Sequence, residues 1–302
     1  MKIAVIGTIN RDLILPFGGA PIQSLGGIFY TVSALSELGG NQIELYPVSF
    51  IGHDLTNPFE SGIDKNRNIN SSGLYLLDQK NHKVILEYKS PEERVEQALL
   101  NFPALEWKQI KPFLSMDFYL VNLITGWDIS LKAYHKLSRK KYDWMYLDIH
   151  FLVMGIDDMG RRFPRYPDDI KPWLQGSRFI QMNQREFEII TDNSMHYLAF
   201  YEQHFKKDQI LIITLGRQGA RIIYRKEKKI RHRQISGFSI NNISDTTGCG
   251  DVFGAAFVWE YLSTGDINLA LEFANKAGAA NCLLKGSDEM DLLPLKIEEF
   301  KY

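Results

Sequence analysis

The chain has 302 residues, enough for one large α/β domain or two small ones, and its 45% hydrophobic and 24% charged residues are ordinary for a globular protein. The formal net charge of −1 gives no overall field that attracts nucleic acid, and no apolar run approaches the roughly 18 residues needed to span a membrane. With only two cysteines a disulfide framework is excluded, so we expect a cytoplasmic protein in a reducing compartment, without nucleic-acid or membrane partners.

Short apolar runs alternate with segments of helical periodicity along the chain. This alternation is typical of a doubly wound, mostly parallel sheet with helices on both faces, an α/β fold. The predicted strands are Ile3–Ile6, Tyr46–Phe50, Phe118–Val121, Trp144–Leu147, Phe179–Met182, Ile210–Thr214 and Ala220–Tyr224. The predicted helices are Phe29–Leu38, Ser130–Leu137, Glu186–Ile190, Tyr197–His204, Val252–Leu262 and Asn268–Leu283.

Two extended stretches interrupt this alternation, at residues 12–25 and 74–90. We predict a single domain over residues 1–302 in which these stretches form a small β lid above the carboxyl ends of the strands, where ligands bind in this architecture. Two unrelated surface hairpins are the alternative. Because lid strands with open edges can pair between chains, a homodimer through the lid is one expected arrangement.

The segment Asp245–Asp251, with the sequence DTTGCGD, carries the most chemical information. Its two glycines permit backbone conformations in which successive N–H groups point into one concavity, and the helix that follows adds the positive end of its dipole. Such a site suits an anion whose charge grows during phosphoryl transfer. Asp251, at the helix start where the dipole favours the ionised carboxylate, is then the candidate base for an attacking hydroxyl. In the alternative interpretation Asp251 is only an N-terminal helix residue and Asp245 only an Asx-turn.

Two familiar phosphate-binding motifs are absent from the sequence. No Gly-x-x-x-x-Gly-Lys-Ser/Thr string occurs, which excludes a P-loop enzyme. Gly248-x-Gly250 is followed by Phe253 where a dinucleotide fingerprint has its third glycine, which disfavours a dehydrogenase.

The string Asp245–Asp251 resembles the carboxyl-terminal signature of the ribokinase-like (pfkB-type) carbohydrate kinase family, usually Asp-Thr-Thr/Asn-Gly-Ala-Gly-Asp. Other segments resemble further family motifs in the expected order: Gly7–Asp12, Gly26-Gly27, Gly52–Asp54, Asn183–Glu186, Thr214–Gly219 and Lys285–Ser287. The resemblance implies a ribokinase-like fold and an ATP-dependent, magnesium-requiring kinase. The expected reaction transfers the γ-phosphoryl group onto a hydroxyl of a sugar or related polyol.

The same resemblance implies a role for each matching residue. Asp251 would be the general base, and the backbone amides of Gly248, Cys249 and Gly250 would form the anion hole. The residues implied in ATP binding are Asn183, Glu186, Thr214, Gly216, Gly219 and Asn275, and those implied in substrate binding are Asn10, Asp12, Gly26, Gly27 and Thr31. Glu186 would act on Mg²⁺ through water, while Asp245 and Thr247 would offer oxygens to a K⁺-type cation. Asn183 also reads as a helix N-cap with Glu186 as its capping-box partner, and the two roles are compatible.

Departures from the family pattern fall on the substrate side. Thr31 stands where the family has a hydroxyl-binding Asn, and the bulky Phe29 and Tyr30 stand where it has small residues. Either these aromatics narrow the pocket, or they stack on a flat group such as a nucleobase, which would favour a nucleoside kinase, or they point into the core. A non-catalytic ligand-binding protein is the alternative from another class. His150 is expected to be a satisfied, partly buried histidine, with contact to phosphate or substrate as the alternative. Cys249 replaces the usual Ala, and we expect a lowered thiol pKa there and inhibition by oxidation or alkylation.

Overall fold

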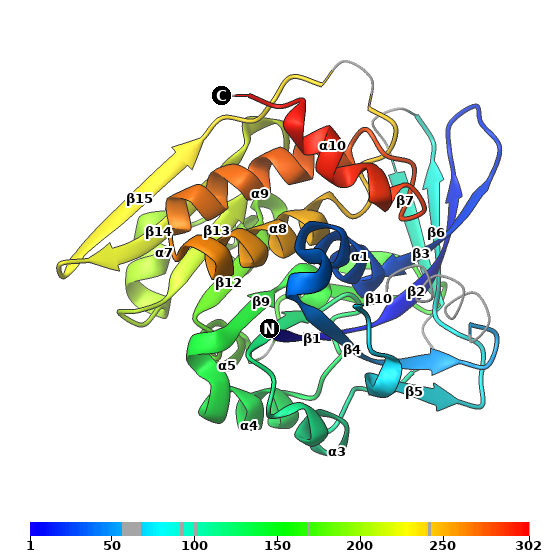
Figure 1. The fold of residues 1–302 in the computed structure, drawn as a ribbon, viewed down its shortest axis with the longest axis horizontal. Coiled ribbons are helices and arrows are strands. Elements are labelled where there is room, and N and C mark those ends of the chain that lie inside the picture. The colour runs from blue at the N-terminus through cyan, green and yellow to red at the C-terminus, as the bar shows by residue number, and fades with distance from the viewer. Residues whose placement is uncertain (56–67, 91–93, 100–101, 168, 241–242, 302) are drawn as a thin grey trace.

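The computed structural model describes residues 1–55, 68–90, 94–99, 102–167, 169–240 and 243–301, and within these ranges a nine-stranded sheet forms the centre of the molecule (Figure 1). Its strands, in spatial order, are β15 (Lys229–Ile235), β14 (Ala220–Lys226), β13 (Ile210–Thr214), β12 (Phe179–Asn183), β9 (Met145–Asp148), β8 (Phe118–Asn122), β1 (Lys2–Ile6), β4 (Glu44–Gly52) and β5 (Leu74–Leu77). Neighbouring strands from β5 to β13 are parallel, whereas β14 and β15 run antiparallel at one edge.

Helices cover both faces of this sheet, as its apolar strands require. One face carries α1 (Ile28–Gly39), α8 (Cys249–Thr264), α9 (Ile267–Asn281) and α10 (Leu293–Glu298). The other carries α3 (Trp107–Ile110), α4 (Leu131–Lys141), α5 (Ile170–Leu174), α6 (Gln184–Thr191) and α7 (Tyr197–His204). The predicted doubly wound architecture is therefore confirmed.

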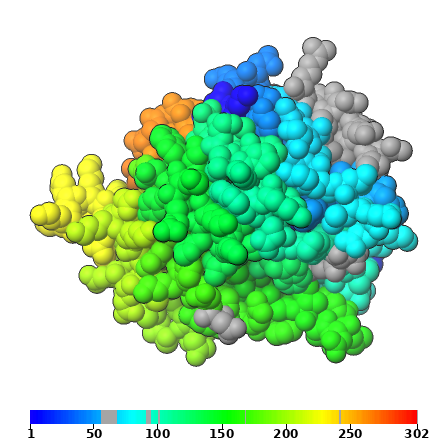
Figure 2. Space-filling model, turned by 90° about the horizontal axis from the view of Figure 1, so that it is seen from below, coloured from blue at the N-terminus to red at the C-terminus, as the bar shows by residue number. Residues whose placement is uncertain are grey.

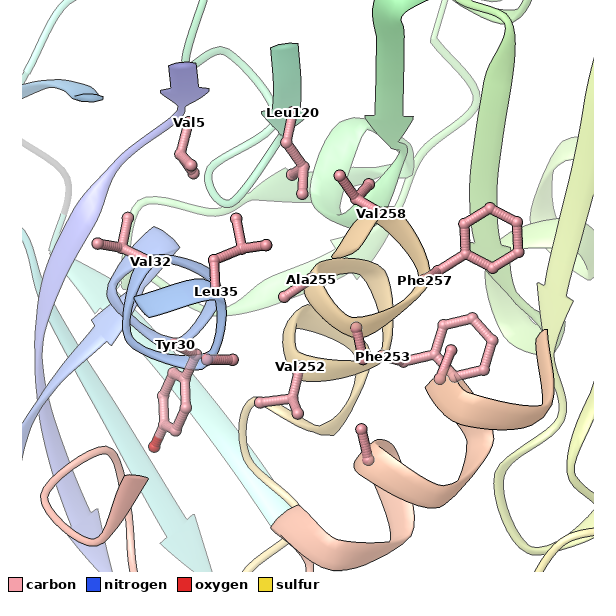
Figure 3. Packing of buried hydrophobic residues seen from close by; sticks show 14 of the residues in the cluster. Val5, Tyr30, Val32, Leu35, Leu120, Val252, Phe253, Ala255, Phe257 and Val258 are labelled. Atoms are coloured by element: carbon pink, nitrogen blue, oxygen red, sulfur yellow. The ribbon is translucent and has the colours of Figure 1, made fainter. Parts of the chain in front are cut away.

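Strand β1 shows how the sequence produces the two cores. Ile3 and Val5 pack on the side of α1 and α8, while Ala4 and Ile6 pack on the opposite side, because successive side chains of a strand point to opposite faces. In Figure 3, Val5 points toward α1 and α8, whose residues Leu35 and Ala255 face each other. Helix α8 is apolar on nearly all sides and packs against α1 and α9, while Gly254 lets it lie close to Tyr146 and Gln181 of the sheet.

A separate four-stranded sheet lies beside the large one, in the order β3 (Ile22–Gly27), β2 (Ile9–Leu15), β6 (Lys83–Tyr88) and β7 (Arg94–Leu99) (Figure 1). Its β2–β6 pair is parallel and its other pairs are antiparallel. One face is closed by a small cluster of Ile14, Val84, Leu86 and Ala98. The small sheet has the position expected of a lid. That it closes over a bound ligand remains a prediction.

The predicted lid segment 74–90 divides between the two sheets. Leu74–Leu77 pairs with β4 as an edge strand of the large sheet, and only Lys83–Tyr88 joins β2. The change of direction is fixed by Asn81, whose Oδ1 accepts from the Gly52 N–H at 3.0 Å and whose own N–H donates to the Asp54 carboxylate at 2.7 Å.

Several short or polar elements were not predicted. These are β15, the hairpin of β10 (Met154–Ile156) and β11 (Arg162–Pro164), and helices α3, α5 and α10. The sequence of β15, KIRHRQI, lacks an apolar run because it is an edge strand with only one neighbour. Seen from below in Figure 2, the middle of the chain (green) forms the surface and the β14–β15 hairpin (yellow) projects at one side. Over the described ranges, no helix has both the length and the apolar character to cross a bilayer.

Candidate active site

A cleft of about 750 Å³ opens at the carboxyl ends of the parallel strands, beside the small sheet. It lies where the strand order reverses around β1, the usual ligand position in a doubly wound sheet, and its volume falls in the range of small-molecule sites. One end, called the acceptor end below, is lined by Asn10, Asp12, Val84, Leu86, Ile124 and Arg162, among others. The other end, called the donor end, is lined by Asn183, Glu186, Thr214, Gly216, Gly219 and Asn275, among others.

Asp251 lies in the first turn of α8 and lines this cleft. Its side chain is buried, and its Oδ1 accepts a hydrogen bond of 2.5 Å from Nδ2 of Asn122, at the end of β8. Burial raises the pKa of Asp251 to about 7, although the Asn122 hydrogen bond acts in the opposite direction. Desolvation therefore opposes the expected stabilisation of the ionised form by the helix start. A carboxyl group with a pKa near neutral can take up a proton in catalysis.

The loop before α8 has the backbone form expected of an anion site. Gly248 has φ of 78°, and a Cβ placed there would lie 2.3 Å from the Tyr30 ring, so a side chain is excluded on both grounds. Figure 3 shows Tyr30 reaching down from α1 to the level of Val252, at the amino end of α8. The Cys249 N–H makes a long bond of 3.4 Å to the Thr246 carbonyl oxygen. The Cys249 N–H is thus partly engaged within the loop, and the role of the three amides in anion binding remains a prediction.

Three buried carboxyl groups gather at the centre of the cleft: Asp148, Glu186 and Asp251. Burial, reinforced by the charge of Asp251, raises the pKa of Glu186 to about 8, and burial raises that of Asp148 as well. Gln181 fixes the group, since its Nε2 donates to Asp148 at 2.6 Å and to the Gly250 carbonyl at 3.1 Å.

This carboxylate set fits a hard, hydrated cation such as Mg²⁺, which would relieve the mutual repulsion of the ionised groups. Within the part of the chain that the structure describes, no three His, Cys, Asp or Glu side chains are close enough to ligate one metal ion directly. Binding of Mg²⁺ through water, as expected for Glu186, remains a prediction.

Apart from Asn275, the predicted donor-end residues lie at or next to strand-to-helix and strand-to-strand turns. Asn183 caps α6: its Oδ1 accepts from the Glu186 N–H at 2.9 Å, and the Glu186 carboxylate accepts from the Asn183 N–H at 2.7 Å. The capping-box interpretation is therefore confirmed, and both side chains also line the cleft. Thr214 ends β13 and is followed by Gly216 and Gly219, both with positive φ. Asn275, on α9, donates to the Ser236 carbonyl oxygen at 2.9 Å.

Asp245 forms the Asx-turn that was considered as its structural role. Its Oδ1 accepts from the N–H and Oγ1 of Thr247, at 2.9 and 2.8 Å, and from the Tyr88 hydroxyl at 3.2 Å. Its Oδ2 is buried and makes no hydrogen bond to the described protein atoms. One carboxylate oxygen is thus committed to the turn, and the role of Asp245 and Thr247 toward a monovalent cation remains a prediction.

The predicted substrate residues divide into two groups. Asn10, Asp12 and Gly27 line the acceptor end. Gly26 instead leaves space for the Asp12 side chain of strand β2, because a Cβ at Gly26 would lie 1.8 Å from the Asp12 carboxylate. Thr31 does not line the cleft: its side chain is completely buried on α1, and its Oγ1 has no hydrogen-bond partner among the described residues. The family motif predicted Thr31 as a substrate-binding residue, but its side chain on α1 is enclosed by the core.

The two aromatic residues of the same helix also differ. Both belong to the hydrophobic core cluster, but only Tyr30 also lines the cleft, where it packs on Gly248. His150 lines the cleft too, with φ of 40° and its N–H bonded to Asp148.

The two cysteines form an unexpected pair beside the anion loop. Sγ of Cys249 lies 3.1 Å from Sγ of Cys282 at the end of α9, and both are free thiols that line the cleft. The hydrogen bond to Cys282, together with burial, raises the pKa of Cys249, and the same hydrogen bond lowers that of Cys282. The expectation of a lowered pKa at Cys249 is therefore wrong; Cys282 is the more acidic thiol.

Several site residues were missed from the sequence. Asn122 and Gln181 carried a usable signal, since each is a polar residue in the apolar run of a buried strand. The pair of Arg162 and Glu96 carried none, because these residues come from a short hairpin and from a lid strand, far apart in the chain.

Comparison with known proteins places this cleft in a familiar fold. Residues 156–293 match the model of the pfkB family carbohydrate kinases. The nucleoside kinase of Burkholderia thailandensis, solved in complex with inosine, superposes with a TM-score of 0.77 at 16% identity, covering 99% of this chain and 97% of that one. Ribokinase of Thermotoga maritima gives a TM-score of 0.75 at 17% identity, with 98% of each chain covered.

The chain has the ribokinase fold. The resemblance to ribokinase-like, pfkB-type carbohydrate kinases predicted from the motifs is confirmed by these matches. A curated relative, the ATP-dependent ribose-1-phosphate kinase of Halopiger xanaduensis, is 30% identical over 130 residues, which are 43% of this chain and 40% of that protein. The match thus spans well under half of the relative's length.

Proposed function

We propose that this protein is an ATP-dependent kinase that phosphorylates a hydroxyl of a sugar or related small polyol. The observation that carries the proposal is the position of Asp251, buried with a pKa of about 7 between the donor and acceptor ends of one cleft. A carboxyl group poised near neutral pH, beside a glycine loop at a helix start, suits proton removal from an attacking hydroxyl.

In the proposed reaction, the acceptor hydroxyl lies between Asp251 and the γ-phosphorus of ATP. The proton of the hydroxyl passes to the Asp251 carboxylate, the acceptor oxygen bonds to the γ-phosphorus, and the bond from that phosphorus to the β–γ bridging oxygen breaks, releasing ADP. The backbone N–H groups of Gly248 and Gly250 would stabilise the growing charge on the transferred group. Asn122 orients Asp251 through the hydrogen bond described above.

ATP, with Mg²⁺, is the proposed phosphoryl donor. Asn183, Glu186, Thr214, Gly216, Gly219 and Asn275 would bind the nucleotide, and Asp148 and Glu186 would hold Mg²⁺ through water. Mg²⁺ would supply charge neutralisation at the phosphates. We further propose that Asp245 and Thr247 bind a K⁺-type cation. The proposed location is the cytoplasm, and the proposed assembly is a homodimer formed through the small sheet.

A nucleoside is the second candidate acceptor. Tyr30 lines the cleft, and apolar side chains of the lid strand β6, Val84 and Leu86, line the acceptor end together with Ile124 and Phe151. Apolar walls suit a flat base attached to the sugar. The highest TM-score quoted above, to the inosine-bound nucleoside kinase, agrees with this choice without deciding it.

The deciding experiment measures ADP release from ATP and Mg²⁺ over a panel of sugars, sugar phosphates and nucleosides. We expect at least one acceptor to give turnover that disappears in the variant Asp251→Asn. Ligand-dependent shifts in melting temperature without any ATP consumption would instead favour a non-catalytic binding protein.

A further inference from the structure

A buried ion pair joins the small sheet to the body of the protein at the acceptor end. Nε of Arg162, on β11, lies 3.3 Å from the carboxylate of Glu96, on β7, and both residues line the cleft. The side chains are only 5% and 12% exposed. Few surface ion pairs are so enclosed, and an enclosed pair is screened far less by solvent and salt.

Arg162 is held on the other sides as well. Its Nη1 donates to the Thr125 carbonyl oxygen at 3.0 Å and its Nη2 to that of Ile124 at 3.5 Å, while the guanidinium covers the Phe151 ring at 4.2 Å. The planar group is therefore fixed in place rather than free to swing toward a ligand. Its charge persists, since arginine stays protonated even when burial lowers its pKa.

The charges along the acceptor end do not favour an anion. Among the described residues lining that end, Asp12 and Glu96 are carboxylates and Arg162 is the arginine; His150 adds a cation only when protonated. Glu96 already neutralises Arg162. A phosphate group brought here would face the Glu96 carboxylate and would have to compete with it for the guanidinium.

We propose that Glu96 makes this cleft selective for uncharged acceptors and excludes those that already carry a phosphate. The inference rests on the proposed kinase function and narrows its substrate class to free sugars, polyols and nucleosides. It separates this chain from the relative named as a ribose-1-phosphate kinase, whose match covers less than half of either chain. Glu96 acts as a specificity residue by holding Arg162, not by contacting the reacting atoms.

The experiment compares kcat/KM for ribose, inosine and ribose 1-phosphate in the wild type and in Glu96→Gln. Glutamine keeps the size and can still accept a hydrogen bond from Arg162, but removes the negative charge. We expect the wild type to prefer an uncharged acceptor, and Glu96→Gln to raise the relative efficiency of ribose 1-phosphate by about ten-fold or more. In the double variant Glu96→Gln/Arg162→Gln that gain should vanish.

Glu87→Gln is the matched control, because Glu87 also lies on a strand of the small sheet but pairs with Lys89 in a largely exposed position, 44% accessible. It should leave the preference unchanged. A melting curve of each variant establishes that it folds, and inhibition of the wild type by ribose 1-phosphate gives a readout that needs no variant. We expect an inhibition constant well above the KM of the best uncharged acceptor.

The outcomes separate this inference from the kinase proposal. If ribose 1-phosphate is the best acceptor of the wild type and its turnover depends on Asp251, the kinase proposal stands and the role of Glu96 is refuted. An unchanged preference in a folded Glu96→Gln variant also refutes it. If no acceptor supports Asp251-dependent ADP release, the kinase proposal fails and the inference fails with it.

Discussion

The two ends of the cleft are built in different ways. Apart from Asn275 on α9, the donor end comes from the ends of single strands and the turns that follow them, at Asn183, the last residue of β12, and at Thr214, the last residue of β13. These segments lie within residues 156–293, which match the family model. The acceptor end is assembled from β2, β6, β7 and the β10–β11 hairpin, which meet only in the folded chain. Site residues that lie close together at the end of one strand form a short motif that can be recognised in the sequence. Site residues that come from distant strands form no such motif.

The two ends meet at Asp251, so the largest effect is expected there. Asp251→Asn should lower kcat by about 10²- to 10⁴-fold, since it removes the general base, while ATP binding changes little. Steady-state kinetics with nucleotide titration by calorimetry measure both. Asp291→Asn, at an exposed position far along the chain, is the control. Near-normal turnover of Asp251→Asn would remove this residue from the proposed role.

The donor end can be tested separately through its cysteines. Alkylation with N-ethylmaleimide should lower activity by about ten-fold or more, because an added group beside the anion loop misplaces the transferred phosphoryl group. Mass spectrometry should find Cys282 modified first, since it is the more acidic thiol, and ATP should protect it. The variant Cys249→Ala/Cys282→Ala should be active and resistant. Full activity after complete modification would contradict this prediction.

The hydrogen bond from Asn122 to Asp251 predicts a change in pH dependence. Because the base must be ionised, kcat/KM of the wild type should rise as the pH passes through about 7, the pKa of Asp251 in the free protein. Asn122→Leu removes a hydrogen bond that lowers this pKa, so the rise should move upward by about one pH unit. Activity would then fall most at low pH and recover above pH 8. A uniform loss at every pH would indicate a structural role only.

The smallest effect on activity is expected from a substitution at Thr31. It tests whether Thr31 belongs to the core or to the acceptor end of the cleft. Thr31→Val should leave the KM of the acceptor unchanged, because the side chain lies in the core and not in the cleft. It should raise the free energy of unfolding by about 1 kcal/mol, since a buried hydroxyl without a partner is removed. Asp12→Asn, in the cleft, should instead raise the acceptor KM. Denaturant unfolding and kinetics on both variants distinguish the two positions, and a raised KM in Thr31→Val would return Thr31 to the substrate site.

The sequence predicted most of the large sheet because its strands are continuous apolar runs, and it predicted the donor end because Asn183 and Glu186 form a local capping box. It misjudged properties that depend on burial: the pKa of Cys249 and the enclosure of Thr31. It could not reveal the pairing of Arg162 with Glu96, because no periodicity or motif connects a short hairpin to a lid strand. Local hydrogen bonding can be read from neighbouring residues, but desolvation and long-range pairing depend on the assembled fold.

The parallel pairing of β2 with β6 has a consequence for the order of folding. β2 and β3 form a local hairpin, but Arg11 pairs with Lys83 only after the intervening chain has passed through β4 and β5 of the large sheet. Contacts that close such long loops form slowly, because the loss of chain entropy precedes the gain in contacts. We therefore expect β6 and β7 to gain protection from hydrogen exchange after β1 and β4 do. The small sheet beside the cleft would then close only after the first strands of the large sheet have paired.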